Sequence, residues 1–571
     1  MEVEFVDITA LKDSQPSTNV GLQEFADIEK LKDRDREKEK IFAIDSLNQF
    51  VLDGTIGTID DARDVAYMTE QPSDSECNFE TIPVIDITFS EPHSSAGITF
   101  NFVDDYPEEV KIQWFKNNIS LMTVIHKPKS PDSTCYQEVT NYNHVVISFL
   151  KTRLPYQYIR LSYIAYGIWL RWGGDILQNA KIFEQVDTTS LTVPINTAEA
   201  TILDKNRDFD ISRDGGLWRF VQNKQRVIIT EDIDKRIVPM GTFFINGKSW
   251  EDNKASFEMI DSVGIMDLYT FYDGHVYKGE KAGNILDDIF RAAEITRYTI
   301  DEDIYNIKLS GWLGIQTCRE ALQTVCLACG ATADDSRSET IRVYTPGKQT
   351  ATSITLMRKF NGNSKLELEP YTYGISTEYA SYESIEEEPV EIYKGTLSLG
   401  MNMVAFDSAY AELEAINATI TRYSDNYAYL KVEDDTKEVL LKGKRHIENK
   451  FILQQVVEEK DVNETENIVQ IGTISLYNPE SAKKLLNKLM DYYGLRKKLS
   501  LKFISEGEHS GIFVNISNRS GSTVTTLIEN QSIDLTGGYI CEASCRGFTA
   551  INKELWYCGD GMYINEIGGI I

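Results

Sequence analysis

The segment EVKIQWF, residues 109–115, decides the fold class of the first large part of the chain. Val110, Ile112 and Trp114 share one face of an extended strand, and the residues between them are polar. Four neighbouring runs show the same short alternating pattern: VIDITF, GITFNF, HVVISFL and YIRLSYIAYG. Strands of this length and spacing predict an antiparallel β-sandwich over residues 85–175.

Further β-rich segments follow the sandwich. A second block runs over about 180–266, and the run IDSVGIMD (260–267) is expected to be its last strand. Residues 350–475 again show mainly strand patterns, and a small barrel-like group of strands ends the chain. We therefore expect a multidomain, mainly β protein with short helix–strand units between its β domains.

Three helices are predicted in the remaining segments. Residues 284–295 place apolar side chains on one helical face, and so do residues 318–330, where Gly330 is the expected C-cap. Asn478 and Pro479 have the residue types of an N-cap and a first helical position. The third helix is accordingly expected over residues 479–493.

The formal charge of −30 limits the classes of partner. It argues against a nucleic-acid-binding surface, because phosphate contacts need clustered Lys and Arg, although DNA could pass a negative wall without sticking. The start of the chain has no apolar signal segment, and the apolar run YIAYGIWLRW (163–172) is too short to span a bilayer. We expect that the chain does not insert into a membrane. We also expect that it is made in the cytoplasm, where its eight cysteines stay reduced.

Three cysteines stand close together in CREALQTVCLACG. Cys318, Cys326 and Cys329 fall on the same helical stripe as Leu322, which is typical of a buried face. The CxxC closes its helix, where the helix dipole opposes a thiolate, and no histidine has ligand spacing to it. We interpret these cysteines as core residues, and the same holds for Cys541 and Cys545 on one face of a strand.

No catalytic, metal or cofactor site is predicted. The segment DKNRDFDISRDGG (204–216) has acidic residues at alternate positions but lacks the Gly and Glu of a calcium loop. The HExxH, GxSxG and Walker A motifs are absent from the sequence. The only contact residues we single out, for a glycan or a protein partner, are aromatic: Trp169, Trp172, Tyr156 and Tyr158. The two tryptophans could instead seat the sandwich on its neighbour.

Several phrases together resemble one family. EPHSSAGITFNF, YPEEVKIQWFKNN and NYNHVVISFLKTRLPYQYIRLSYIAYG look like the discoidin-like, galactose-binding-type sandwich of tail proteins from phages and prophages of Gram-positive bacteria. LSGWLGIQTCREALQTVCLACGATADDSRSETIRVY and LIENQSIDLTGGYICEASCRG resemble further segments of the same tail proteins. The phrases follow one another over about 85–550.

The resemblance implies a baseplate or tail hub located in the virion. In that family a homotrimer with two barrel-like domains per subunit joins the tail tube to the spike or tail tip and surrounds the channel for DNA. The implied partners are the tail tube protein, the spike or tail tip and other baseplate proteins. The implied domains are an N-terminal extended or helical segment (1–84), the sandwich (85–175), a first hub barrel (176–270), an α+β domain (271–349), a second hub domain with its helix (350–549) and a C-terminal tail (550–571).

Two other functions stay open at this point. The sandwich could make the chain a glycan-binding adhesin, acting at the receptor. Unrecognised carboxylates could make it a tail-associated cell-wall hydrolase, although no pair among 88 Asp and Glu residues can be singled out. We expect a structural protein rather than an enzyme.

Overall fold

The protein is mainly β, as the sequence predicts. The structure is a computed structural model that describes residues 1–23, 26–32, 65–103, 105–233, 236–345, 350–360, 362, 364–457, 467–517, 523–550, 555–558 and 562–565. The chain forms two compact units. Unit 1 comprises residues 1–177, 201–228 and 245–257, and unit 2 comprises residues 178–200, 229–244 and 258–571. The finer division into six domains stays a prediction.

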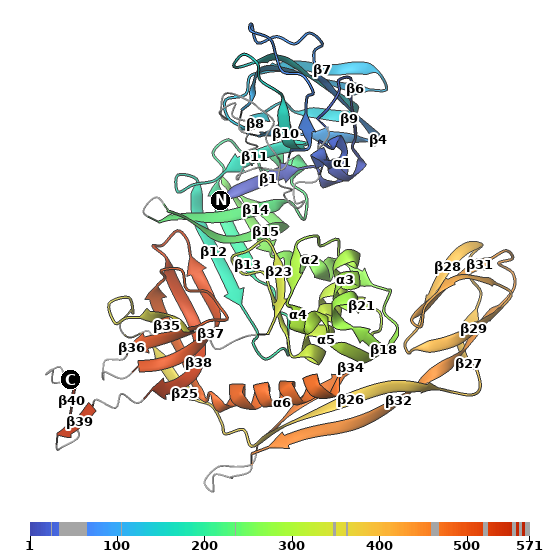
Figure 1. The fold of residues 1–571 in the computed structure, drawn as a ribbon, viewed down its shortest axis with the longest axis vertical. Helices are drawn as coiled ribbons and strands as arrows, with labels where there is room; N and C mark the ends of the chain where they lie inside the picture. Colours follow the sequence, from blue (N-terminus) through green and yellow to red (C-terminus); the bar gives the residue numbers. More distant parts are fainter. Residues whose placement is uncertain are drawn as a thin grey trace, which may run out of the picture. The chain divides into compact units, whose positions relative to one another are not determined.

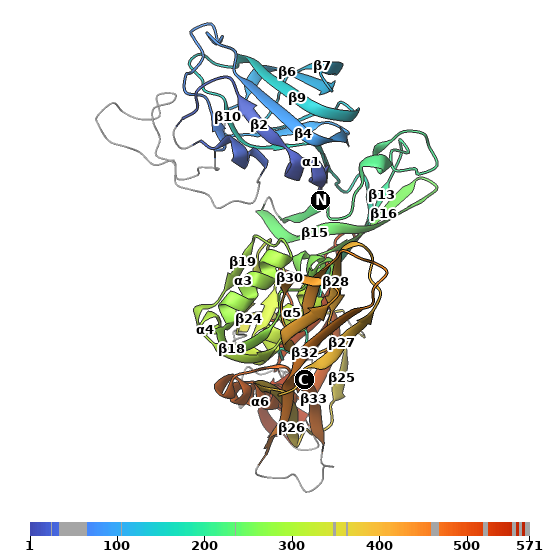
Figure 2. The ribbon, with the colours of Figure 1, turned by 90° about the vertical axis from the view of Figure 1, so that its right-hand side faces the viewer.

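Unit 1 contains the expected β-sandwich (Figure 2). One sheet has five strands in the order β2-β4-β9-β6-β7: Gln15–Thr18, Val84–Ser95, Val139–Thr152, Pro107–Lys116 and Ile119–His126. The other has four strands in the order β3-β10-β5-β8: Tyr67–Met68, Arg160–Ala165, Ile98–Phe102 and Asp132–Cys135. Val110, Ile112 and Trp114 of β6 are buried in the shared apolar core. The alternation that predicts this strand therefore marks its core face.

The described N-terminal residues belong to unit 1. Strand β1 (Glu2–Val6) pairs with β11 (Gly167–Arg171), and β2 joins the five-stranded sheet. Helix α1 (Ile8–Asp13) is capped by Asp7. The residues of β1 are almost all buried, as is usual for a strand inside a sheet. Most of the mixed-charge run at 30–40 lies outside the described residues.

The core of unit 2 is formed largely by three helices that the sequence predicts. Helix α3 is Ala282–Ala292, α5 is Cys318–Cys329 and α6 is Pro479–Gly494. Helix α5 begins with a capping box between Thr317 and Glu320 and ends at Gly330 in the left-handed conformation. Asn478 caps α6 by accepting two backbone N–H groups. Apolar faces of all three helices share one core.

The run IDSVGIMD is helical rather than a strand, so that expectation is wrong. Helix α2 (Ser262–Ile265) and the 3-10 helix η3 (Met266–Leu268) occupy it. Asp261 accepts the N–H of Gly264 at 2.7 Å and thereby caps α2. The short apolar run at 260–267 does not distinguish the two structures, because a short buried helix and a short buried strand can have the same apolar pattern.

A β-sheet in unit 2 joins strands that are far apart in the sequence. Strand β12 (Leu177–Gln185) pairs through residues 181–185 with β37 (Thr523–Asp534), which pairs with β38 (Ile540–Ala550). Beyond β38 lie β35 (Lys497–Ile504) and the outermost strand β25 (Lys365–Leu368). Strands β36 (Phe513–Ser517) and β24 (Thr350–Ile354) continue from β37 on a second path. The sheet therefore ends at β25, with nothing paired to its far side among the described strands.

A long hairpin carries an inserted module in unit 2 (Figure 1). Strands β26 (Gly374–Ile385) and β32 (Val439–Val456) form the hairpin. Between them lie β27 (Val390–Gly395), β28 (Gly400–Ala405), β29 (Tyr410–Ile416), β30 (Thr419–Tyr423) and β31 (Tyr427–Val432), which share a small apolar core with the end of β32. We call residues 390–432 the arm module.

One buried amide holds the arm module. Asn426 is fully buried; its Nδ2 donates to the carbonyl oxygens of Gly274 and Leu313, and its Oδ1 accepts from Trp312 Nε1. Because both ends of the amide are satisfied, Asn426 fixes the module to the α+β part of unit 2.

Candidate assembly surface

The free end of the unit 2 sheet exposes a row of large apolar side chains. Residues 356–360 and β25 lie one after the other along β35, through the bonds of Phe360 N to Lys502 O and of Ile504 N to Arg358 O, both at 2.9 Å, and through the β25–β35 register. We call residues 356–360 and β25 the open edge. Leu356, Met357, Leu366 and Leu368 on it are exposed by 44, 95, 54 and 67%. An open edge strand with exposed leucines is the usual sign of a contact with another chain.

Three basic side chains at or beside the open edge form ion pairs within the chain. Lys365 Nζ lies 2.6 Å from Glu367, and Lys502 Nζ lies 2.8 Å from Glu542. Arg358 Nη1 lies 3.1 Å from Glu506. A partner that covers the apolar row would therefore meet these three basic groups already in ion pairs.

Arg358 also anchors the open edge to the interior. Its Nη2 donates to both oxygens of Glu508, at 2.6 and 2.7 Å, and both side chains are largely buried. Burial would raise the pKa of Glu508, but the bonds from Arg358 and from the backbone N–H of Glu506 lower that pKa below its ordinary value. The edge position is thus fixed by a charge-assisted, two-point contact.

A second buried ion pair lies behind this contact. Arg337 donates to Glu184 of β12, and Gln531 of β37 donates to the same carboxylate at 2.7 Å. Gln531 Nε2 also donates to the carbonyl oxygen of Glu508 at 2.9 Å. Since each buried charge has a partner, the polar core specifies one register for strands that meet from distant parts of the sequence.

Two buried aspartates and one half-buried aspartate form an acidic group in unit 2. Asp261 accepts the N–H of Asn196 at 2.6 Å, and Asp335 accepts the N–H of Ser262 at 2.8 Å. Burial and the nearby Asp335 carboxyl raise the pKa of Asp261 well above its ordinary value. Burial is also the main cause that raises the pKa of Asp334 to about 7. These side chains therefore favour the protonated form, in which one carboxyl can donate to another.

The four aromatic residues singled out from the sequence are not gathered into one site. Trp172 is 4% exposed and packs on Phe5, Phe209 and Phe257, so it is a core residue and its expected ligand contact is corrected. Trp169 is half-buried against a separate small cluster, and Tyr158 packs on another. Tyr156 is exposed, with a positive φ of 59°. Ligand contact by Trp169, Tyr156 and Tyr158 stays a prediction.

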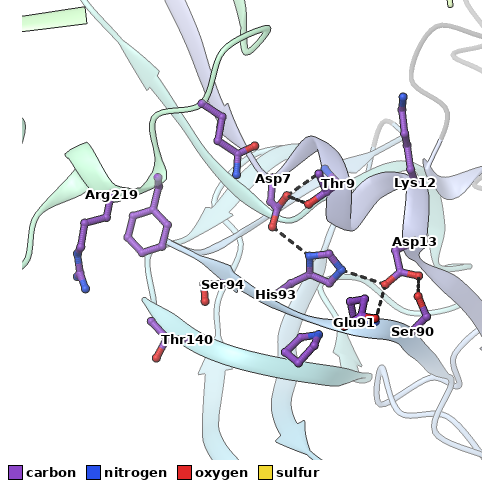
Figure 3. A pocket seen from close by; sticks show the side chains of 13 residues that line it. Asp7, Thr9, Lys12, Asp13, Ser90, Glu91, His93, Ser94, Thr140 and Arg219 are labelled. Atoms are coloured by element: carbon purple, nitrogen blue, oxygen red, sulfur yellow. Dashed lines mark hydrogen bonds and ion pairs between the residues drawn. The ribbon is translucent and has the colours of Figure 1, made fainter. Parts of the chain in front are cut away.

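A polar depression of about 820 Å³ in unit 1 surrounds His93 (Figure 3). The Nδ1 atom of His93 lies 3.2 Å from Asp7, and its Nε2 atom lies 3.0 Å from Asp13. Asp13 also accepts hydrogen bonds from Ser90 Oγ and, at 3.0 Å, from Glu91 N. Burial raises the pKa of Asp13, but these bonds and the one from His93 bring that pKa below its ordinary value.

This arrangement connects the α1 segment to the sandwich. Both ring nitrogens of His93 contact carboxylates, one at each end of α1. His93 therefore holds the α1 segment, through Asp7 and Asp13, on strand β4.

The cysteines of α5 lie in the core, as predicted. Cys318, Cys326 and Cys329 are buried, and burial raises the pKa of Cys318 to about 11 and that of Cys326 to about 12. Cys541 and Cys545 are buried as well. Within the described ranges, no group of three or more His, Cys, Asp or Glu side chains could hold a metal ion.

The acidic segment 204–216 contains a local turn. Asp204 accepts the backbone N–H groups of Asp208 and Phe209, at 2.8 and 2.9 Å. The Asp204 carboxylate thereby accepts hydrogen bonds from the backbone of its own loop.

None of the helices in the described part of the chain is of a length and apolarity that would let it cross a membrane.

Comparisons with known proteins place the chain beside tail proteins. No family model matches it, and no curated protein matches it either. Solved structures that resemble it include a tail protein from Neisseria meningitidis, with 11% identity and a TM-score of 0.39 over 65% of this chain and 92% of that one. Another is an E. coli component of the type VI secretion system, described as similar to T4 bacteriophage tail proteins gp27 and gp5, with 9% identity and a TM-score of 0.32 over 66% and 74% of the two chains.

A Clostridium perfringens family 32 carbohydrate-binding module, solved with galactose, covers only 30% of this chain, at 5% identity and a TM-score of 0.19. That the sandwich is discoidin-like, and that the host is Gram-positive, stay predictions. The neighbours that cover about two thirds of this chain are tail or tail-like proteins, the class that the sequence phrases resemble. Since each TM-score is below 0.5, these likenesses carry no argument about function.

The open edge was missed from the sequence. The run KLEL in β25 has the same alternation as a core strand, because Leu366 and Leu368 stand on one face. Only the long-range pairing with β35 shows that β25 is the last strand of this sheet among the described strands. The one available signal was the short strand between charged residues, which is common at sheet edges.

Proposed function

We propose that the chain is a structural subunit of a phage tail or tail-like particle, acting as a hub that joins the tail tube to the spike or tail tip. The observation that supports it most is the open edge, where an apolar row stands on an unpaired sheet end and its neighbouring charges are already paired. Such a surface suits contact with another folded chain rather than with a small substrate. The sequence resemblance to tail hubs supports the same proposal.

The assembly we propose is a homotrimeric ring. Closed rings need one surface of each subunit to meet a different surface of the next, and the open edge offers one of the two surfaces. The charge of −30 suits a ring around DNA, because a negative wall repels the phosphates that pass it. The tail tube, the spike or tip and other baseplate proteins are the proposed partners.

The test is to locate the chain in the particle. Antibody against the purified protein should label one end of isolated tails in electron micrographs, at the end opposite the head. Labelling of fibres, or no labelling of particles that contain the chain by mass spectrometry, would count against a hub. A peptidoglycan zymogram with the full chain should stay blank, and a cleared band would instead favour a hydrolase.

A further inference from the structure

Unit 2 holds a cavity that the proposed assembly role does not use. Its volume is about 680 Å³, within the range of roughly 300–1,000 Å³ that is common for small-molecule sites. Most of its wall is apolar and comes from α6, from the short helix α4 (Glu302–Tyr305) with Ile307, and from strands β36 and β37: Ile304, Ile307, Leu485, Leu495, Phe513 and Leu527. A wall of this kind suits an aliphatic chain.

One cationic side chain lies half-buried in this apolar wall. Lys488 of α6 donates from Nζ to Ser190 Oγ at 2.7 Å and to the carbonyl oxygen of Gly330 at 2.9 Å. An ammonium group has three N–H bonds, so these two neutral acceptors leave one bond unused. No carboxylate in the described part of the chain forms an ion pair with Lys488.

One carboxylate lies near Lys488. Asp187 is near enough to raise the pKa of Lys488, and the two Asp187 oxygens accept bonds from Thr189 and Thr192. Burial outweighs this effect and lowers the pKa of Lys488 to about 8. The amine is therefore still mostly charged at neutral pH while partly removed from water, a state that an incoming anion stabilises.

Three further charged side chains line the cavity. Lys484, Asp303 and Asp491 are exposed to solvent and carry charges of both signs. Water screens such groups, so they contribute little to selecting a ligand. The apolar wall and the half-buried ammonium group of Lys488 therefore determine which ligand the cavity selects.

From this geometry we infer that the cavity binds a single-chain amphiphile with a carboxylate head, of the fatty-acid class. The aliphatic chain covers the apolar wall, and the head accepts the unused N–H of Lys488. None of the open edge residues lines the cavity, so the ligand site and the proposed assembly contact use different residues.

The test is calorimetric titration of the full chain with laurate, below its micelle concentration. We expect saturable binding, and weaker binding by about tenfold or more in Lys488→Met, because one charge-assisted hydrogen bond is lost. Lys483→Met is the matched control: it removes an exposed amine from the same helix, outside the cavity, and should bind as the unchanged protein does. Leu495→Trp narrows the cavity and should also weaken binding.

Three outcomes would overturn the inference. One is the absence of saturable heat with the unchanged chain. Another is equal binding of laurate by Lys488→Met and the unchanged chain, and a third is equal binding of dodecanol, which has the chain but no charged head. Dodecyl phosphate separates the two anionic heads: binding tighter than that of laurate would show that the site takes a phosphate and that the carboxylate assignment is wrong.

Discussion

Arg358 Nη2 lies 2.6 and 2.7 Å from the two carboxylate oxygens of Glu508, inside unit 2 and directly behind the open edge. This pair connects the segment that carries Leu356 and Met357 to the polar core. The surface that we assign to assembly is therefore held by a buried charge pair and not only by strand pairing.

Breaking this pair should destabilise unit 2. Arg358→Met leaves Glu508 buried without its partner, and we expect a loss of about 3–5 kcal/mol in the free energy of unfolding, measured by denaturant titration. Glu506→Gln removes only the exposed partner of Arg358 and should change stability by less than about 1 kcal/mol. The double variant Arg358→Met, Glu508→Leu should recover most of the loss. If it is as unstable as Arg358→Met, the pair does not act as described.

The acidic group gives unit 2 a pH dependence of a definite sign. The pKa of Asp334 is raised from its ordinary 3.8 to about 7 in the folded state, so the stabilising protonated form is fully present below about 4 and is lost as pH rises towards 7. The free energy of unfolding should fall over that interval. Asp334→Asn should flatten the fall, because an amide oxygen can still accept the bonds from Ser336. An unchanged slope in the variant would contradict the assignment.

The open edge should control self-association without affecting the fold. Leu366→Glu with Leu368→Glu places two charges in the apolar row, and we expect the trimer to dissociate while the melting temperature stays within a few degrees. Ile119→Glu is a matched control, since Ile119 is 70% exposed on a strand of unit 1. Light scattering should show a trimer for the control. Equal dissociation of both variants would show that the effect is not specific to the edge.

Asn426 should govern the protection of the arm module. Asn426→Ala leaves the carbonyl oxygens of Gly274 and Leu313 and the indole N–H of Trp312 without their partner, at a cost of about 1–3 kcal/mol for each group that stays buried. Hydrogen exchange should speed up in residues 390–432 while helix α5 stays protected. Uniform acceleration throughout unit 2 would mean that Asn426 acts on the whole unit.

Local patterns in the sequence predict much of the fold. The caps at Asn478 and Gly330 lie where the helix ends fall, and the alternation in β6 marks its core face. These features depend on neighbouring residues only. Short apolar runs are less decisive, as the helix at Ser262–Ile265 shows.

Long-range pairing could not be predicted in this way. The contact of Glu184 with Gln531, and the position of β25 at a sheet end, join residues that no local pattern connects. The same limit applies to the candidate surfaces. Leu366 and Lys488 have the pattern of ordinary strand and helix positions. Only the surrounding structure shows that Leu366 is exposed and that Lys488 lines an apolar cavity.

The most direct test of the assembly account is the native mass of the purified chain, by light scattering after gel filtration over a concentration series. The account predicts a species that grows with concentration to three times the 64.9 kDa mass of one chain. A chain that stays monomeric at every concentration, both alone and when mixed with tail tube protein, would contradict it.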